Sequence, residues 1–252
     1  MNFVGIIPAR YGSVRFPGKS LAILGNRPVI RWVYEKSALS LDEVFVATDD
    51  ERIMKTVEDF GGNAVMTDPG HQSGTDRCRE AMDSIISTRG MEIDVVINIQ
   101  GDEPFIRKEE IDLLKECFSE KETEIASLVK IIENTDDIFD ENKPKVLMDK
   151  NNRALMFSRN PIPFIRGKKK PEWIHHHTFY RHIGIYAYRK EVLREITEMD
   201  RSPLEIAESL EQLRWLENGK KIKLAITKHD SIGIDTPADL KKAEIYLRKI
   251  QR

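Results

Sequence analysis

The chain has 252 residues, of which 40% are hydrophobic and 33% charged, and its formal net charge is −2. This length and composition predict one large α/β domain, or one domain with a subdomain, around a substantial core. The small negative charge argues against general nucleic-acid binding, which usually needs a basic excess. The two cysteines, Cys78 and Cys117, lack the spacing of a metal site and indicate a reduced, cytoplasmic setting.

The sequence also gives no sign of insertion into a membrane. The apolar run 3–8 is far too short to span a bilayer. No basic stretch precedes a long apolar run, so we expect no signal peptide.

Strands and helices alternate along the first hundred residues. Continuous apolar runs predict buried strands, and apolar residues at helical spacing predict helices. The strands are expected at 3–8, 42–48, 64–66 and 94–100, and the helices at 28–40, 50–60 and 75–88. This βαβα order indicates a mainly parallel sheet flanked by helices on both faces.

The second half has a more mixed pattern, which indicates a smaller mixed subdomain. Strands are expected at 124–130, 155–158, 181–188 and 223–226, and helices at 203–217 and 239–250. Thr236 and Pro237 occupy the cap and first-turn positions of the last helix. The basic stretch 166–171 predicts a mobile loop.

The loop after the first strand has the composition of a phosphate-binding loop. Gly12 and Gly18 let the backbone approach an anion, while Arg10, Arg15 and Lys19 supply positive charge. The spacing of the glycines excludes a Walker P-loop and a dinucleotide fingerprint. A basic surface loop is the alternative, but a loop that directly follows a strand favours phosphate binding.

Two aspartates are candidate ligands for a hard cation such as magnesium. Asp102 follows the strand 94–100, and open α/β sheets bind ligands at the carboxyl ends of their strands. Asp235 ends a short strand expected at 232–234. Each aspartate could instead cap a following helix, and for Asp235 this alternative is at least as strong.

Three further polar segments have a functional and a structural interpretation. The loop 70–77 could bind a base or ribose at a helix N-terminus, or Thr75 could be a helix cap and Arg77 a surface residue. On the helix 203–217, the polar side is either a solvated face or a surface for sugar hydroxyls. His182 could meet a carboxylate or lie satisfied in the core.

Nine motifs together resemble the CMP-KDO synthetases, the 3-deoxy-manno-octulosonate (KDO) cytidylyltransferases. The resemblance covers nearly the whole chain, and the set is far more specific than the first motif alone. The motifs are Ile7–Ser13, Arg15–Lys19, Ala47–Asp50, Ser73–Arg77, Asn98–Pro104, Phe157–Arg159, His182–Gly184, Ser209–Arg214 and Gly233–Pro237.

The resemblance implies a glycosyltransferase-A-like nucleotidyltransferase fold in a single domain, 1–252. The segment 1–123 would be its nucleotide-binding half, 124–230 its sugar-binding and dimerisation half, and 231–252 its closing strand and helix. It implies a homodimer that converts CTP and KDO to CMP-KDO and pyrophosphate for lipopolysaccharide biosynthesis, with Mg²⁺ as cofactor.

The family's functional residues carry over to positions that match its motifs. Lys19, Asp102 and Asp235 would be catalytic, and the two aspartates would hold the metal. The nucleotide-binding residues would be Arg10, Gly12, Ser13, Arg15, Lys19, Thr75, Arg77 and Gln100. The sugar-binding residues would be Arg159, His182, Tyr186, Glu211 and Gln212.

Two other functions remain open. One is a cytidylyltransferase for another acidic sugar, such as sialate or an 8-amino KDO analogue; the segment Arg15–Ser20 favours KDO over sialate. The other is a non-catalytic binding domain, which typically lacks the lysine or the metal carboxylates that this chain retains.

Overall fold

The computed structural model describes residues 1–230 and 232–250. The chain forms two compact units, each described here by itself. Unit 1 comprises Met1–Asp112, Arg189–Thr197 and Ser231–Arg252, and unit 2 comprises Leu113–Tyr188 and Glu198–Asp230. Ser231, the first residue of the predicted closing segment, lies outside the described residues.

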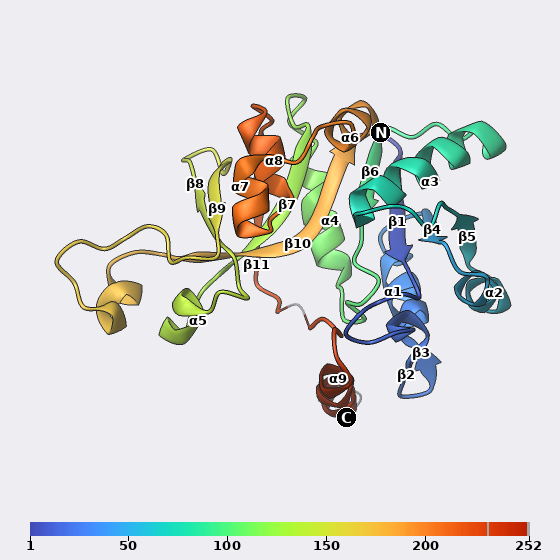
Figure 1. Cartoon of the computed structure of the whole chain (residues 1–252), viewed down its shortest axis with the longest axis horizontal. Helices are drawn as coiled ribbons and strands as arrows, with labels where there is room; N and C mark the ends of the chain where they lie inside the picture. Colours follow the sequence, from blue (N-terminus) through green and yellow to red (C-terminus); the bar gives the residue numbers. More distant parts are fainter. Residues whose placement is uncertain (231, 251–252) are drawn as a thin grey trace. The chain divides into compact units, whose positions relative to one another are not determined.

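Unit 1 contains a parallel sheet and its helices (Figure 1). The strands are β1 (Phe3–Ala9), β2 (Ile23–Leu24), β3 (Arg27–Pro28), β4 (Glu43–Thr48), β5 (Asn63–Met66) and β6 (Val95–Asn98). The helices are η1 (Lys19–Leu21), α1 (Val29–Ser37), α2 (Glu51–Asp59), α3 (Gly74–Arg89), α6 (Lys190–Thr197) and α9 (Pro237–Ile250). Helix α4 (Lys108–Cys117) begins in unit 1 and ends in unit 2.

The parallel sheet has the order β6, β1, β4, β5. Nearly every residue of β1 and β4 is buried, because α1 and α3 both pack against these two strands. Strands enclosed on both sides read as continuous apolar runs, which is why the sequence located them. The prediction of a mainly parallel α/β fold is confirmed.

Unit 2 combines parallel and antiparallel strands. Its strands are β7 (Ile125–Ile131), β8 (Lys145–Met148), β9 (Ala154–Ser158), β10 (Tyr180–Arg189, whose last residue belongs to unit 1) and β11 (Ile222–Thr227). Strand β11 is parallel to β7, whereas β7 with β10, β10 with β8, and β8 with β9 are antiparallel pairs. Its helices are α5 (Thr135–Phe139), η2 (Lys170–His175), α7 (Pro203–Glu208) and α8 (Gln212–Glu217).

The prediction of one continuous helix over 203–217 is wrong. Helix α7 ends at Glu208, and α8 begins only at Gln212. Between them Ser209 adopts a left-handed conformation with φ of 51°. Because of this break, α8 does not continue the helical spacing of α7. Gln212 is buried instead of lying on a solvated face.

The short strand expected at 232–234 is also absent. Residues 232–234 have no regular secondary structure, although Ile234 is fully buried. The alternation of apolar residues there reflects burial of one side chain and not pairing in a sheet.

The predicted loop 166–171 runs into the short helix η2. Trp173 of η2 is buried against Ile138 and Phe179.

No helix within residues 1–230 and 232–250 combines the length and the apolar character needed to cross a membrane.

A buried ion pair joins the two short helices on either side of the break. The Arg214 guanidinium donates from Nε and Nη2 to the two carboxylate oxygens of Glu205, both at 2.8 Å. Glu205 also closes a capping box with Ser202 at the start of α7. Helices of six residues are unstable alone, so this pair and the surrounding core hold them in place.

We predict that Glu205→Gln destabilises the protein by about 3 kcal/mol, because it leaves the Arg214 charge buried without its counter-ion. Urea unfolding at pH 7 measures this loss. Glu58→Gln, at an exposed position of α2, is the control and should change the unfolding free energy by less than about 0.5 kcal/mol.

The same pair makes stability dependent on pH. Burial disfavours the charged form of Glu205, but the hydrogen bonds from Arg214, Ser202 and Arg201 outweigh it and lower the pKa of this carboxyl below 4.5. The stabilisation is therefore complete above the unfolded-state pKa and is lost as the pH falls through the lowered folded-state value. The loss of unfolding free energy caused by Glu205→Gln should therefore shrink in acid. A loss that stays the same at low pH would contradict the lowered pKa of Glu205.

Candidate functional site

The phosphate loop and the Asp102 loop leave the sheet at the same edge. Strands β1 and β6 are parallel neighbours, with Phe3 opposite Val95 and Ile6 opposite Asn98. Because both strands end at one edge, the loops that follow them lie side by side. This arrangement is the structural basis of the site in unit 1.

The phosphate loop is organised around Tyr11. Its carbonyl oxygen accepts hydrogen bonds from the backbone N–H groups of Ser13 and Gly18, both at 2.9 Å. Gly18 has a φ of 69°, and a Cβ there would lie 2.9 Å from the Tyr11 ring. The Arg52 guanidinium covers this ring, 3.4 Å from its centroid. Gly18 thus allows the close turn that begins η1 at Lys19.

Lys19 lies between the two predicted metal-binding aspartates. Its ammonium group donates to Asp102 Oδ2 and to Asp235 Oδ1, the latter at 3.0 Å. Burial disfavours the ammonium form, but the two carboxylates outweigh burial and raise the pKa of Lys19. Arg15 makes a second ion pair with Asp235, at 3.1 Å.

The structure excludes the capping interpretation of both aspartates. Helix α4 begins at Lys108, six residues after Asp102. At the start of α9, the Thr236 hydroxyl accepts from the Asp239 N–H, while the Asp239 carboxylate accepts from Thr236 N–H. Thr236 is therefore the cap, and the Asp235 side chain is directed to Lys19 and Arg15.

A main-chain hydrogen bond brings the Asp235 segment to the Asp102 loop. The Ile234 N–H donates to the Asp102 carbonyl oxygen at 2.9 Å. The two carboxylates thus belong to adjacent backbone segments, a relation that the sequence did not reveal. Their shared contact with one ammonium group shows that a cation is stabilised between them.

No group of three or more His, Cys, Asp or Glu residues in the described chain is placed to hold a metal ion. The protein would therefore offer a divalent cation two carboxylates in unit 1, from Asp102 and Asp235. Magnesium suits such a set, because it often takes one or two carboxylates and completes its shell with water and substrate phosphates.

A cavity of about 180 Å³, open to solvent, lies beside these residues. Of the predicted nucleotide-binding residues, Arg10, Lys19, Arg77 and Gln100 line it, as does Asp102. Gly101 allows the loop after β6 to approach β1, because a Cβ there would lie 2.9 Å from the Pro8 carbonyl oxygen.

The other predicted nucleotide-binding residues lie elsewhere in unit 1. Gly12, Ser13 and Arg15 belong to the phosphate loop but are not among the residues that line the cavity. Thr75 is only 3% exposed, inside the first turn of α3. The structural alternative, in which Thr75 caps this helix, is wrong, since the Ser73 side chain accepts from the Asp76 N–H and is the cap.

Arg77 is a buried residue and not a surface one. Its guanidinium donates to Thr67 Oγ1 at 2.5 Å and to Asp49 Oδ2 at 2.8 Å. These bonds to the residues that directly follow β4 and β5 fix the side chain at the wall of the cavity. Arg77 thus presents a positive charge whose direction is set before any ligand binds.

The structure adds cavity-lining residues that the sequence did not single out as binding residues: Ser20, His71, Gln72, Ser73 and Gly74. The Ser20 hydroxyl is buried and finds no hydrogen-bond partner among the described residues. Its position directly after Gly18 and Lys19 is the signal that could have identified it. The four others fall in the loop 70–77, for which a nucleotide contact was proposed without naming them.

Unit 2 brings His182 and Tyr186 together on β10. Their ring centroids are 5.2 Å apart, and Phe157 packs edge-on against the other side of His182. His182 as a whole keeps some solvent exposure, but its ring is enclosed. This burial lowers the pKa of His182 to about 3. The imidazole is neutral and its Nε2 lies 2.9 Å from the Ser127 hydroxyl.

Tyr186 also lies near the start of α8. Burial, with a smaller effect of the Glu211 carboxylate, raises the pKa of the Tyr186 hydroxyl well above 10, so it stays protonated. The Tyr186 hydroxyl, Gln212 Nε2 and Trp215 Nε1 are all buried without a hydrogen-bond partner among residues 1–230 and 232–250. Buried polar atoms are normally paired, so these groups are candidate contacts for a polar ligand.

Arg159 has a different place from the other predicted sugar-binding residues. Its guanidinium donates to the carbonyl oxygens of Glu141, Glu208 and Ser209, at 2.9, 2.7 and 3.3 Å. The Glu208 carboxylate in turn accepts from Ser158 Oγ and from the Arg159 N–H. These bonds hold the helix break at Ser209, from which Glu211 and Gln212 follow.

Comparison with known proteins agrees with this geometry. Residues 4–222 match the cytidylyltransferase family. The fold and the charged site of unit 1 thus define a nucleotidyltransferase of the cytidylyltransferase class.

Individual relatives of the chain identify a narrower family within this class. The chain is 57% identical over 251 residues to the 3-deoxy-manno-octulosonate cytidylyltransferase of Parabacteroides distasonis, covering 98% of each chain. It is 56% identical over 257 residues to that of Bacteroides thetaiotaomicron, covering 98% of this chain and 99% of the relative. A solved structure of CMP:2-keto-3-deoxy-manno-octonic acid synthetase complexed with CTP has a TM-score of 0.90 and 38% identity, over 99% of this chain and all of that one.

The chain belongs to the 3-deoxy-manno-octulosonate cytidylyltransferase family.

We predict that the His182 ring does not titrate between pH 5 and pH 8. Because enclosure holds its pKa at about 3, its ring resonances should stay constant over this range. An NMR titration of the ¹⁵N-labelled protein measures this, with His182→Gln to assign the signals. A transition with a midpoint above pH 5 would show that the ring is not enclosed.

Proposed function

We propose that the protein transfers the cytidylyl group of CTP to KDO and releases pyrophosphate. The observation that carries this proposal is the Lys19 ammonium group between Asp102 and Asp235 at a cavity lined by further cationic and polar groups. Relatives named 3-deoxy-manno-octulosonate cytidylyltransferase, at up to 57% identity, support CTP and KDO as the substrates.

In the proposed reaction, an oxygen–phosphorus bond forms between the anomeric hydroxyl of KDO and the α-phosphorus of CTP. The bond from the α-phosphorus to the bridging oxygen breaks, pyrophosphate leaves, and the proton of the hydroxyl passes to water. Such transfers depend mainly on positioning the groups and on neutralising charge. No separate general base is required among the residues named here.

The cations of unit 1 would bind the triphosphate. Lys19 supplies a mobile point charge, whereas Arg10 and Arg15 can bind phosphate oxygens through a planar guanidinium. Arg77, held by Asp49 and Thr67, would orient the nucleotide at the cavity wall. Gln100 and the Ser20 hydroxyl would add neutral hydrogen bonds to the bound nucleotide.

We infer that Asp102 and Asp235 hold magnesium. The stabilised ammonium between them and their oxygen donors fit a hard cation that takes its remaining ligands from phosphates and water. When bound there, the ion would supply Lewis-acid charge neutralisation and lower the pKa of a coordinated hydroxyl. Lys19 would then interact with the phosphates.

Unit 2 would bind the sugar through neutral groups. The protonated Tyr186 hydroxyl and the amide of Gln212 are buried and can hydrogen-bond to sugar hydroxyls. The neutral His182 can donate or accept one hydrogen bond without adding charge. Glu211, beside Tyr186, can accept from a hydroxyl, and Arg159 would hold the segment that carries it.

Homodimer formation and a cytoplasmic location stay predictions. The first rests on the resemblance to the family, and the second rests on the cysteine pattern and the expected lack of a signal peptide.

Substrate identity is tested by pyrophosphate release from CTP with a panel of acidic sugars. We expect KDO to give a higher kcat/KM than sialate, because Arg15–Ser20 has the KDO-type sequence. An 8-amino KDO analogue is the third sugar of the panel. A preference for either of the other sugars would replace KDO in the proposal. Magnesium-dependent turnover with any of them would exclude a purely binding function.

The metal assignment is tested by Asp102→Asn. We expect kcat to fall about 1000-fold, as when a charge-stabilising group is removed in phosphoryl transfer, while CTP still binds. Steady-state kinetics and calorimetric titration with CTP measure the two effects. Asp42→Asn, an exposed residue before β4, is the control; near-normal turnover of Asp102→Asn would disprove the role of this carboxylate.

A further inference from the structure

We propose that Leu247, on the C-terminal helix α9, is a positioning residue for the Asp235 carboxylate. It acts through an apolar cluster that underlies the charged loops of unit 1. The inference rests on the proposed function of Asp235 as a cation ligand, and it adds a residue twelve positions further along the chain.

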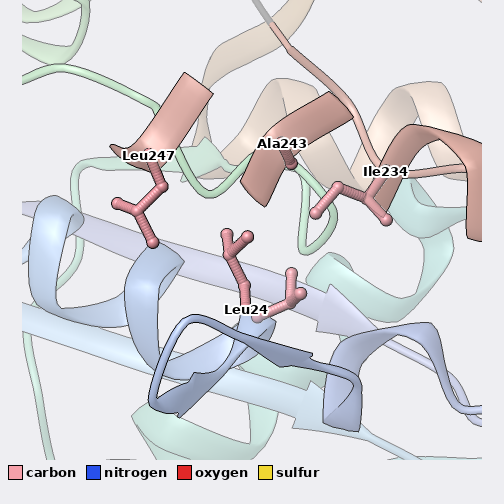
Figure 2. Close-up of a cluster of buried hydrophobic side chains, with 5 residues drawn as sticks. Leu24, Ile234, Ala243 and Leu247 are labelled. Carbon is pink, nitrogen blue, oxygen red and sulfur yellow. The ribbon is translucent and has the colours of Figure 1, made fainter. Parts of the chain in front are cut away.

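The apolar cluster joins α9 to the segment around β2. Leu24, Val29, Ile234, Ala243 and Leu247 form it, each between 0% and 4% exposed. In Figure 2 the side chains of Ile234 and Leu247 approach Leu24 from the C-terminal segment, with Ala243 between them on the helix. The cluster therefore has one wall from the N-terminal part of the chain and one from its C-terminal part.

Close in sequence to Lys19, Asp102 and Asp235 are residues that belong to the cluster or pack against it. Phe16 and Ala22, which pack against the cluster, enclose Lys19 in sequence. Phe105, three residues after Asp102, packs against it and also meets the Tyr246 ring at 4.8 Å. Ile234 directly precedes Asp235 and lies in the cluster itself.

The contacts of Asp235 explain why its position depends on this cluster. Its side chain is 44% exposed and pairs with the side chains of Lys19 and Arg15, which the proposal assigns to phosphates. The neighbouring backbone is fixed by the Ile234 N–H bond to the Asp102 carbonyl. The Ile234 side chain, packed in the cluster with Leu24 and residues of α9, would hold the backbone in place for this bond.

Leu247 closes the cluster on the side of α9. It is 4% exposed, whereas Ile245, two residues earlier on the same helix, is 57% exposed. Truncation of Leu247 would leave a cavity into which Ile234 can shift, and Asp235 would move with it. A displacement of about 1 Å in a catalytic group can reduce a rate 100-fold.

The test compares Leu247→Ala with Ile245→Ala in the full-length protein. Manganese serves as the probe, and its binding in the presence of CTP is measured by electron paramagnetic resonance. We expect Leu247→Ala to weaken manganese binding about 10- to 100-fold, the usual effect of losing a residue that orients a metal ligand. Binding of CTP without metal should change less than about twofold, because α9 does not line the nucleotide cavity.

Ile245→Ala should leave both affinities unchanged. Leu247→Val, which removes less volume, should give an intermediate loss of manganese affinity and keeps the test decisive if the alanine variant unfolds. Equal losses for CTP and manganese, or unchanged manganese affinity in folded Leu247→Val and Leu247→Ala, would overturn the proposal.

The Asp235→Asn background separates this inference from the proposed function. If Leu247 acts through Asp235, Leu247→Ala should weaken manganese binding no further once Asp235 is replaced. Normal manganese affinity of Asp235→Asn alone would disprove the metal role of Asp235. A weakened Asp235→Asn together with an unaffected Leu247→Ala would disprove only the positioning role, and an additive loss in the double variant would show that Leu247 acts by another route.

Discussion

The charged site of unit 1 depends on one ammonium group between two carboxylates. Lys19 is 83 residues from Asp102 and 216 residues from Asp235 in sequence, yet it donates to both. A half-buried lysine or a carboxylate pair would each be unfavourable alone, because like charges repel and burial penalises isolated charge. Together they neutralise one another while remaining close enough to solvent to exchange partners with a charged ligand.

The parallel sheet explains why part of this arrangement was predictable from the sequence. Lys19 and Asp102 follow strands that any βαβ pattern places in one sheet, and loops at one edge converge. The position of Asp235 has another origin. It follows no strand, and its place depends on burial of Ile234 and on one backbone hydrogen bond to Asp102. Such long-range contacts have no local signature, so before the structure only the family resemblance paired the two aspartates.

Unit 2 shows the opposite limit of sequence reasoning. Apolar spacing over 203–217 predicted one helix, because periodicity reports local preference and not the partners that interrupt it. The interruption at Ser209 is held by Arg159, about fifty residues earlier, and by the ion pair of Glu205 with Arg214. A left-handed serine is locally unfavourable, and it persists because these contacts outweigh its strain. Because the predicted helix has no break at Ser209, it places Gln212 on the polar face, whereas Gln212 is buried in the structure.

The two units therefore prepare different kinds of recognition. Unit 1 uses charged side chains, whose attraction for phosphates is strong but not selective for one nucleotide or sugar. In unit 2 the enclosed His182 is neutral, Tyr186 stays protonated, and buried polar atoms await partners. A buried donor left unpaired is costly, so a sugar that lacks the matching hydroxyl would bind far more weakly than one that has it. If the proposed function holds, charge neutralisation in unit 1 would set the rate, and the neutral hydrogen-bonding groups of unit 2 would choose the sugar.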